Sequence, residues 1–403
     1  MTVRANKPAF NIREKLKELT HNIGLKGREL MGAATVQEAR DLVSAGRKNI
    51  IHNGNMEINQ RGASSATTLT TEGFHLLDRW AFALNTAGTW TASQQDNTSS
   101  TDPFRKSYRV TVNTTASFIG NTYCFLGQGI EGHDVNHLNY GTNKAKPLTL
   151  SFWVKSNYPG RKIVEFELRQ NPGVNKSISR EYTINSADTW EYKTITIPGN
   201  SEFSSLDGTV LALRVFFWIA AGTDFTSSNL STTWTNSSNT SRVSGISNDV
   251  AENVGGYFEI TGVQLEVGKN ATDFEYRSFA EELALCQRYY RSLSAGRIFS
   301  VSNGSGTAIG ANIHHPVTMR PSPSPTFYGS NSTTGNVVMY SSEPGNQTNY
   351  ITAANNFSGA MNGIECFGWN ASSFSPGFPS AASGWIDLGF GSNNLRIEFS
   401  SEI

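Results

Sequence analysis

The sequence is poor in charge, in cysteine and in long apolar runs. Only 16% of its 403 residues are charged, and 33 Lys and Arg balance 33 Asp and Glu. A chain without net charge has no overall field to attract nucleic acid or an anionic membrane, so neither is expected as a partner. The three cysteines, Cys124, Cys286 and Cys366, are far apart and fit neither a disulfide framework nor a zinc pattern, so each is expected to be a small core residue.

Signals for membranes, export and common catalytic chemistry are also missing. No stretch approaches the roughly 20 apolar residues of a membrane span, and the start MTVRANKPAF lacks the apolar core of a secretory signal. We therefore expect no membrane insertion, and synthesis in a cytoplasm. The chain holds no GxSxG elbow, P-loop or dinucleotide fingerprint, so no catalytic residue is assigned and the protein is expected not to be an enzyme.

What the sequence does contain is a series of short strands separated by Gly, Asn, Pro and Ser clusters. Residues 148–155 alternate Leu148, Leu150, Phe152 and Val154 with more polar neighbours, which is the two-residue period of a half-buried strand. Similar strands are predicted over residues 105–113, 163–168, 191–197, 209–220 and 257–267. Many short strands at this spacing indicate a β-sandwich or barrel. Residues 225–250, rich in Ser, Thr and Asn, are expected to form a long loop.

Helices are predicted at both ends of this β region. Ser278 and Glu281 form a capping box, and an apolar stripe follows at Phe279, Leu283, Cys286 and Tyr290. Near the N-terminus, a second stripe has the same spacing of 4, 3 and 4 residues at Ile12, Leu16, Leu19 and Ile23. This stripe needs a partner, which is either the rest of the chain or an assembly partner.

Four stretches together resemble one family. They are NIIHNGNMEINQRG (residues 49–62), LTLSFWVKSN (148–157), DTWEYKTITIPG (188–199) and the run from VQLEVG to EELALCQRYY (263–290). Their order is similar to that of tail-fibre and related virion proteins of bacteriophages, in which a jelly roll like that of carbohydrate-binding modules precedes a small C-terminal β domain. The resemblance implies a mainly β fold, with residues 49–59 beside residues 258–267.

The resemblance also divides the chain and suggests its role. It implies a helical attachment or assembly arm (1–48), a jelly-roll domain (49–275), a connecting helix (276–294) and a small C-terminal β domain (295–403). The protein is expected in the virion, bound to other virion proteins through the arm, and assembled as a homotrimer that binds host-surface glycans. Two alternatives stay open: a head or tail decoration or connector protein, and a polysaccharide depolymerase.

Candidate ligand contacts are aromatic residues outside the strongest strand patterns. Sugar recognition uses aromatic faces for C–H groups and polar side chains for hydroxyls. Trp90, Tyr158 and Trp234 are the candidates, because they lie in polar or loop-like surroundings. Phe152 and Trp153, by contrast, lie in a strand pattern and are expected to be core.

Other polar clusters are assigned ordinary structural roles. His133, Asp134 and His137 lie close together but without a diagnostic metal-ligand spacing, and are expected to form a solvated loop. Glu165 and Glu167 are expected to form one solvated strand face rather than the facing carboxylates of a glycosidase. No cofactor is expected. A structural calcium ion stays open, since many carbohydrate-binding jelly rolls hold one; Glu57 and Glu266 are its candidate ligands, although the pattern favours plain surface carboxylates.

Overall fold

The computed structural model describes residues 48–63, 65–99, 101–170, 173–203, 208–293, 296–302, 309–320, 323–328, 337–341, 348–351, 366–368, 374–375, 383–388 and 396–403. The arm predicted over residues 1–48, with its stripe of Ile12, Leu16, Leu19 and Ile23, lies outside these residues except for Lys48. No helix in the described part of the chain is long and apolar enough to cross a membrane.

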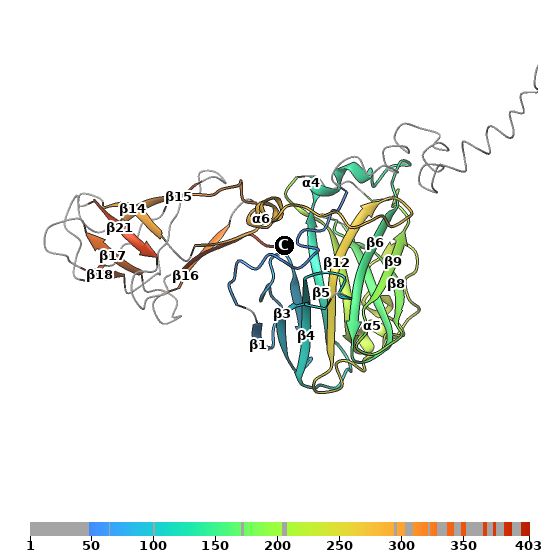
Figure 1. Ribbon diagram of the computed structural model, residues 1–403. Coiled ribbons are helices and arrows are strands. Elements are labelled where there is room, and N and C mark those ends of the chain that lie inside the picture. Colours follow the sequence, from blue (N-terminus) through green and yellow to red (C-terminus); the bar gives the residue numbers. More distant parts are fainter. Residues whose placement is uncertain are drawn as a thin grey trace, which may run out of the picture.

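Two antiparallel six-stranded sheets pack face to face as a β-sandwich (Figure 1). Sheet A contains, in order across the sheet, β1 (Ser65–Leu69), β3 (Thr89–Asp96), β4 (Lys106–Thr114), β12 (Tyr257–Val267), β6 (Leu148–Ser156) and β9 (Glu191–Ile197). Sheet B contains β11 (Thr235–Asn236), β8 (Lys176–Ile184), β7 (Gly160–Leu168), β10 (Leu211–Ala221), β5 (Tyr123–Glu131) and β2 (Ala81–Asn85). The chain crosses repeatedly between the sheets, and the predicted β-sandwich is confirmed.

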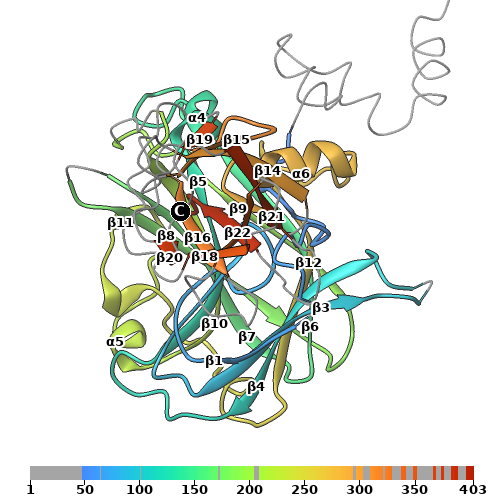
Figure 2. The ribbon, with the colours of Figure 1, turned by 90° about the vertical axis from the view of Figure 1, so that its left-hand side faces the viewer.

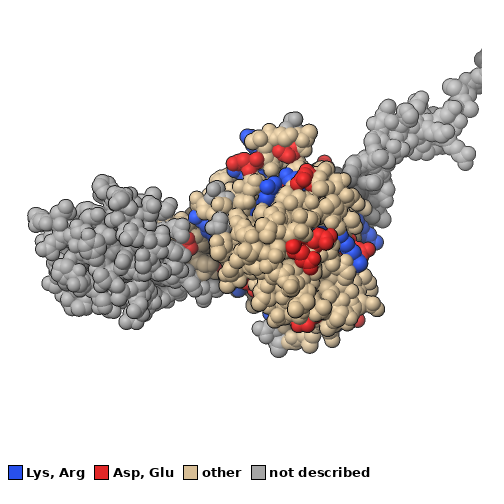
Figure 3. All heavy atoms as spheres, turned by 90° about the horizontal axis from the view of Figure 1, so that it is seen from below, with Lys and Arg blue, Asp and Glu red and all other residues tan. Residues whose placement is uncertain are grey.

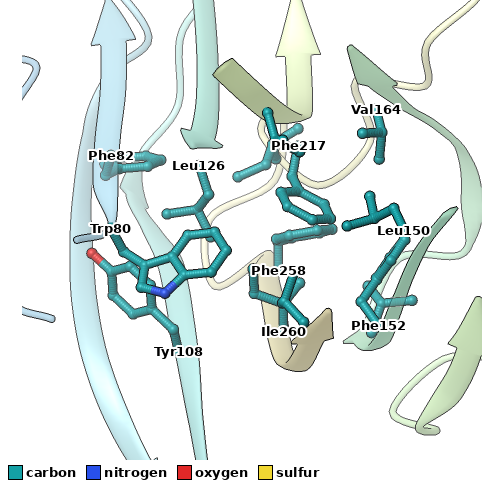
Figure 4. Close-up of a cluster of buried hydrophobic side chains, with 14 of the residues drawn as sticks. Trp80, Phe82, Tyr108, Leu126, Leu150, Phe152, Val164, Phe217, Phe258 and Ile260 are labelled. Atoms are coloured by element: carbon teal, nitrogen blue, oxygen red, sulfur yellow. The ribbon is translucent and has the colours of Figure 1, made fainter. Parts of the chain in front are cut away.

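The core lies between the two sheets and is built from the inward half of each alternating strand. Figure 4 shows Tyr108, Phe152, Phe217 and Ile260, from four different strands, converging there with Trp80, which directly precedes β2. Their side chains are almost completely buried, and the Phe152 ring meets the Phe217 ring edge to face at 5.0 Å. Residues 49–54 complete this layer beside β12, as expected, because the Ile50 N–H donates to Leu265 O and the Val263 N–H donates to Gly54 O.

Short helices and a long covering segment complete the sandwich. The helices are α4 (Gly132–Val135), η1 (Asn136–Leu138), α5 (Thr223–Thr226) and η2 (Asn239–Ser241). The predicted loop 225–250 thus begins within α5 and contains β11 and η2. It covers part of the outer face of sheet B, where Phe225 and Val243 pack with Trp218 in a second, smaller core.

The helix after β12 is shorter than predicted. α6 (Phe279–Gln287) begins at the predicted capping box, in which the Glu281 N–H donates to Ser278 Oγ and the Glu281 carboxylate accepts from the Ser278 N–H. Residues 290–293 form a strand rather than the last turn of the helix expected over 276–294. The helix ends before Tyr290, so the predicted stripe is incomplete. Phe279, the first residue of the helix, is 59% exposed.

Two further sheets follow α6. One contains β13 (Tyr290–Leu293), β22 (Arg396–Ser400) and β16 (Ser324–Tyr328). The other contains β19 (Cys366–Gly368), β15 (Ile309–His314), β14 (Gly296–Ser302), β21 (Ser383–Leu388), β17 (Val337–Ser341), β18 (Thr348–Ile351) and β20 (Phe374–Ser375). Figure 1 shows this second sheet beside the sandwich, with α6 between them, and Figure 2 looks at the molecule from that side.

The last described residues return to the sandwich through a buried ion network. Arg79, whose side chain is 1% exposed, places Nη1 2.5 Å from Glu402 Oε2 and stacks its guanidinium 3.5 Å from the centre of the Tyr289 ring. Arg61 bridges Asp78 at 2.8 Å and Glu402 at 3.6 Å. Two arginines and two carboxylates thus join the first part of the sandwich to residues that follow β22.

Charge is sparse on the face of the molecule that is shown in Figure 3. Figure 3 views the molecule from below, and on this face isolated basic and acidic side chains interrupt a mostly uncharged surface. This pattern agrees with the low charged fraction of the sequence, 16%.

Candidate functional site

The outer face of sheet A carries polar and aromatic side chains in register. Alternation in β6 sends Phe152 into the core and leaves Ser151 and Trp153 on the outer face. The pairing of β6 with β9 places Thr194 opposite Ser151 and Tyr192 opposite Trp153. The Trp153 and Tyr192 rings lie 5.3 Å apart between centroids, and Tyr192 is 45% exposed. This pair forms one side of the candidate site.

A bulge in β12 makes room for another ring on the same face. The register between β12 and β6 shifts between Thr261 and Gln264, and Gly262 within the bulge has a φ of 59°. A Cβ atom on Gly262 would lie 2.2 Å from Cε2 of Phe104. Glycine is therefore required at position 262 for two reasons. It tolerates the left-handed backbone, and it leaves the space that the Phe104 ring occupies.

Phe104, Phe274 and Tyr276 pack together as an aromatic wall on the other side of the site. Phe104 comes from the link between β3 and β4, and the other two come from the connector after β12 (residues 268–277). The Phe104 ring meets Phe274 edge to face at 4.8 Å and stacks on Tyr276 at 5.7 Å. Tyr276 is 71% exposed, so this wall presents aromatic surface to solvent.

An open groove of about 950 Å³ lies between the Trp153–Tyr192 pair and the aromatic wall. Ligand sites in proteins range over roughly 300–1,000 Å³, so this groove has room for several linked units of a small ligand. The other residues that line it are Pro103, Thr149, Ser151, Thr194, Thr196, Gly262, Lys269, Asn270, Ala271, Thr272 and Asp273. We call it the outer groove. A second hollow, about 20 Å³ and lined by Leu138, Tyr140 and Leu213, has room for little more than a water molecule.

The chemistry of the outer groove is aromatic at its sides and hydroxylic on its floor. Ser and Thr hydroxyls can donate and accept hydrogen bonds, while the flanking rings offer flat apolar faces. The charged residues among the described lining are Lys269 and Asp273, which are of opposite sign. The groove thus suits a neutral, hydroxyl-rich ligand with apolar faces.

Trp90, one of the three predicted ligand contacts, is a core residue, so that prediction is wrong. It is fully buried on β3, its Nε1–H donates to Ala87 O at 2.9 Å, and its ring lies 5.4 Å from that of Phe82. The polar neighbours Thr89 and Thr91 indicated exposure, but they are the alternate positions of a strand whose other face enters the core.

The other two predicted contacts, Tyr158 and Trp234, are partly buried and lie outside the outer groove. Both pack against the main core. Trp234 also donates its Nε1–H to Pro198 O at 2.8 Å and lies 6.3 Å from the Tyr140 ring. The structure therefore does not bring the three predicted residues together at one site.

Sequence reasoning missed the residues that line the outer groove. Trp153 was expected in the core with Phe152, although neighbouring strand residues point to opposite faces. The alternation that placed Phe152 inside therefore already indicated that Trp153 is outside. No such signal existed for the wall, because Phe104 and Tyr276 are far apart in sequence and meet only in the folded chain.

The two glutamates of β7 are buried, so the predicted solvated strand face is wrong. Glu165 is 0% exposed and Glu167 is 5% exposed. Arg242, from the segment that covers sheet B, donates to both Glu165 oxygens at 2.9 Å, and Trp218 Nε1–H donates to Oε2 at 2.9 Å. Burial raises the pKa of Glu165 although Arg242 opposes that shift. The carboxylate is engaged in structural contacts rather than in an open cleft.

The histidine cluster lies on two short helices rather than in the expected loop, and Glu266 is buried, at 3% exposure, rather than a surface carboxylate. His133 and Asp134 lie in α4 and His137 in η1. Glu266 accepts hydrogen bonds from the Thr272 N–H at 2.8 Å and from Gln264 Nε2 at 2.9 Å, so its carboxylate is already occupied. Within the described ranges there is no group of three or more His, Cys, Asp or Glu that could hold a metal ion.

Comparison with known proteins gives distant structural neighbours. No protein-family model and no curated protein matches the sequence. The chain is similar to the enzymatically active domain of tailspike protein 4 of bacteriophage CBA120, with 15% identity, a TM-score of 0.30, and coverage of 55% of this chain but only 21% of that one. It is also similar to a putative sugar binding protein of Bacteroides thetaiotaomicron, with 12% identity, a TM-score of 0.30, and coverage of 55% and 100%.

A third neighbour is the CBM22-2 xylan-binding domain of Paenibacillus barcinonensis Xyn10C, with 13% identity, a TM-score of 0.27, and coverage of 55% of this chain and 99% of that one. All three TM-scores are below 0.5. The function proposed below therefore rests on the outer groove of this chain.

Proposed function

We propose that the protein binds glycans through the outer groove and does so as a component of a bacteriophage virion, such as a tail fibre or related appendage. The observation that carries the first part is the groove itself, in which the exposed rings of Tyr192 and Tyr276 and the half-buried ring of Trp153 flank a floor of Ser and Thr hydroxyls. Aromatic faces and hydroxyls are the groups that contact sugar rings and sugar hydroxyls. The virion role is supported by the resemblance of residues 49–62, 148–157, 188–199 and 263–290 to virion proteins.

Binding without cleavage is the reaction class that the groove favours. Glycoside hydrolysis uses two carboxyl groups that face each other about 5 to 9.5 Å apart. Of the described residues that line the outer groove, Asp273 is the one that carries a carboxylate. We therefore expect the purified protein to release no new reducing ends from a polysaccharide that it binds.

The test measures binding to a panel of soluble polysaccharides, namely xylan, galactan, mixed-linkage glucan, mannan and alginate, together with envelope polysaccharides of candidate hosts. Trp153→Ala and Tyr192→Ala should each weaken binding at least about tenfold, equivalent to about 1.4 kcal/mol, because each removes one aromatic face. Phe279→Ala is the matched control, since Phe279 is an exposed aromatic residue that does not line the groove. Binding that Trp153→Ala and Tyr192→Ala leave unchanged would contradict the proposal.

Assembly through the N-terminal arm would make a weak groove useful. One shallow groove is expected to bind at about millimolar strength, roughly −4 kcal/mol. Linking three copies in a homotrimer can raise the apparent affinity by about 10² to 10⁴ without new contacts. Removing residues 1–47 should then leave the sandwich folded while abolishing both trimer formation, measured by light scattering, and incorporation into particles. A truncated protein that enters virions at normal levels would contradict this role of the arm.

A further inference from the structure

The connector that forms the aromatic wall has two faces with different partners. Phe274 and Tyr276 line the outer groove, whereas Glu275 and Arg277, between and after them, contact residues 48–51. Adjacent residues of an extended chain point in opposite directions, so the alternation in this FEYR stretch separates ring positions from anchoring positions. The groove wall and the base of the N-terminal arm therefore share one short segment.

Glu275 is the centre of the anchoring face. Its Oε2 atom accepts from the Asn49 N–H at 2.7 Å and from the Lys48 N–H at 3.1 Å, and it lies 3.3 Å from Arg277 Nη2. The side chain of Lys48 also binds the connector, because its Nζ donates to Thr272 Oγ1 at 2.7 Å and to the carbonyl of Asp273. Hydrogen bonds with a charged partner are about twice as strong as neutral ones.

The rest of the connector is held by isolated hydrogen bonds rather than by regular secondary structure. At its start, the Thr149 hydroxyl donates to Gly268 O at 2.9 Å and the Thr196 hydroxyl donates to Lys269 O at 3.2 Å. Residues 268–277 form neither helix nor strand. On the side of β12, the Glu275 N–H donates to Gln264 Oε1 at 2.8 Å and the Thr272 N–H donates to Glu266 Oε1 at 2.8 Å. With no strand ladder or helical hydrogen bonds, the positions of Phe274 and Tyr276 depend on these side-chain hydrogen bonds and on packing against the Phe104 ring.

We propose that Glu275 is a positioning residue of the outer groove, which sets the aromatic wall by fixing the connector to residues 48 and 49. It touches no ligand itself. The inference rests on the proposed glycan site for its effect on binding, but its structural part stands without a ligand. It follows that a change that breaks the contacts of Lys48 or Asn49 with the connector also moves the aromatic wall and changes the shape of the groove.

The ligand-free test is hydrogen exchange of the full-length protein, read on peptides that cover residues 268–277 and, separately, β6. Glu275→Ala should raise exchange in the connector, where the Thr272 and Glu275 amides are hydrogen bonded, and leave β6 unchanged. Lys48→Met should raise it less, because the acceptor at Glu275 remains. Glu275→Gln keeps an oxygen acceptor and should restore most of the protection. Glu202→Gln is the control, since Glu202 is 79% exposed and 3.7 Å from Lys176.

The binding test uses whichever polysaccharide of the panel responds most to Trp153→Ala. Glu275→Ala should weaken its binding about tenfold, or about 1.4 kcal/mol. Because Glu275 acts through the wall, it should have no further effect in a Tyr276→Ala, Phe274→Ala background, but should add to Tyr192→Ala. Unchanged exchange in the connector, or an effect that adds fully to loss of the wall, overturns the inference. If Trp153→Ala and Tyr192→Ala do not affect binding, it is the proposed function that fails, and the exchange result still decides the role of Glu275.

Discussion

Replacing Glu402 by Gln should strongly destabilise the sandwich, although residue 402 lies far along the chain from its partners. Arg79 and Glu402 are 1% and 3% exposed, and their closest atoms are 2.5 Å apart. Glutamine keeps the shape of the side chain but removes the charge, which leaves the guanidinium of Arg79 buried without its carboxylate. Removing one partner of a buried ion pair typically costs about 3–5 kcal/mol.

The assay is equilibrium unfolding by denaturant and by heat, followed by the fluorescence of the buried tryptophans Trp80, Trp90 and Trp218. For domains of about 150–250 residues, each kcal/mol shifts Tm by about 2–4 °C, so the expected fall is about 6–20 °C. The double variant Arg79→Met, Glu402→Leu should be less destabilised than the sum of its single changes, because neither charge is then left unpaired. A loss below about 1 kcal/mol for Glu402→Gln, similar to that of the exposed control Glu202→Gln, would refute the reasoning.

Three further changes test the fold and the groove. Gly262→Ala should weaken polysaccharide binding and lower stability together, because its Cβ would displace the Phe104 ring from 2.2 Å and residue 262 has a positive φ; titration calorimetry and melting curves measure both, and unchanged affinity would show that Phe104 is not part of the site. Trp90→Ala should cost about 3–5 kcal/mol of stability, as for other buried tryptophans, and an almost unchanged Tm would contradict its core position. Burial raises the pKa of Asp78 from 3.8 to about 7, so the folded protein binds this proton more tightly than the unfolded chain does. The free energy of unfolding should therefore fall as pH rises from about 4 to about 7, by at most about 4 kcal/mol at 1.36 kcal/mol per pKa unit, and Asp78→Asn should flatten that fall; an identical pH profile for Asp78→Asn would remove Asp78 as the cause.

The fold could be predicted because its signals are local. Alternation in residues 148–155 and the capping box at Ser278 and Glu281 depend on neighbours in sequence, and the structure reproduces both. Burial of Trp90 was missed for a related reason, since its Thr neighbours describe the opposite face of the same strand. A strand pattern shows that two faces exist, but reading it requires assigning each residue to one of them.

The candidate site could not be predicted because it is formed by residues that are far apart in the sequence and meet only in the folded chain. Phe104 and Tyr276 meet over Gly262 only when the link between β3 and β4 and the connector after β12 come together. The burial of Glu165 depends in the same way on Arg242, 77 residues later, which covers the outer face of sheet B. Nothing in the local sequence states which outer face stays open and which is covered.

The ion pair between Arg79 and Glu402 has a consequence for folding during protein synthesis. The two residues are separated by 323 positions, and ribosomes add about 5–20 residues per second, so Arg79 is made about 16 to 65 s before its carboxylate partner exists. During that interval a guanidinium that ends up 1% exposed has no Glu402 to neutralise it. We expect the segment around residue 79 to stay hydrated until Glu402 has been made, so that this corner of the sandwich closes only after translation has passed that residue.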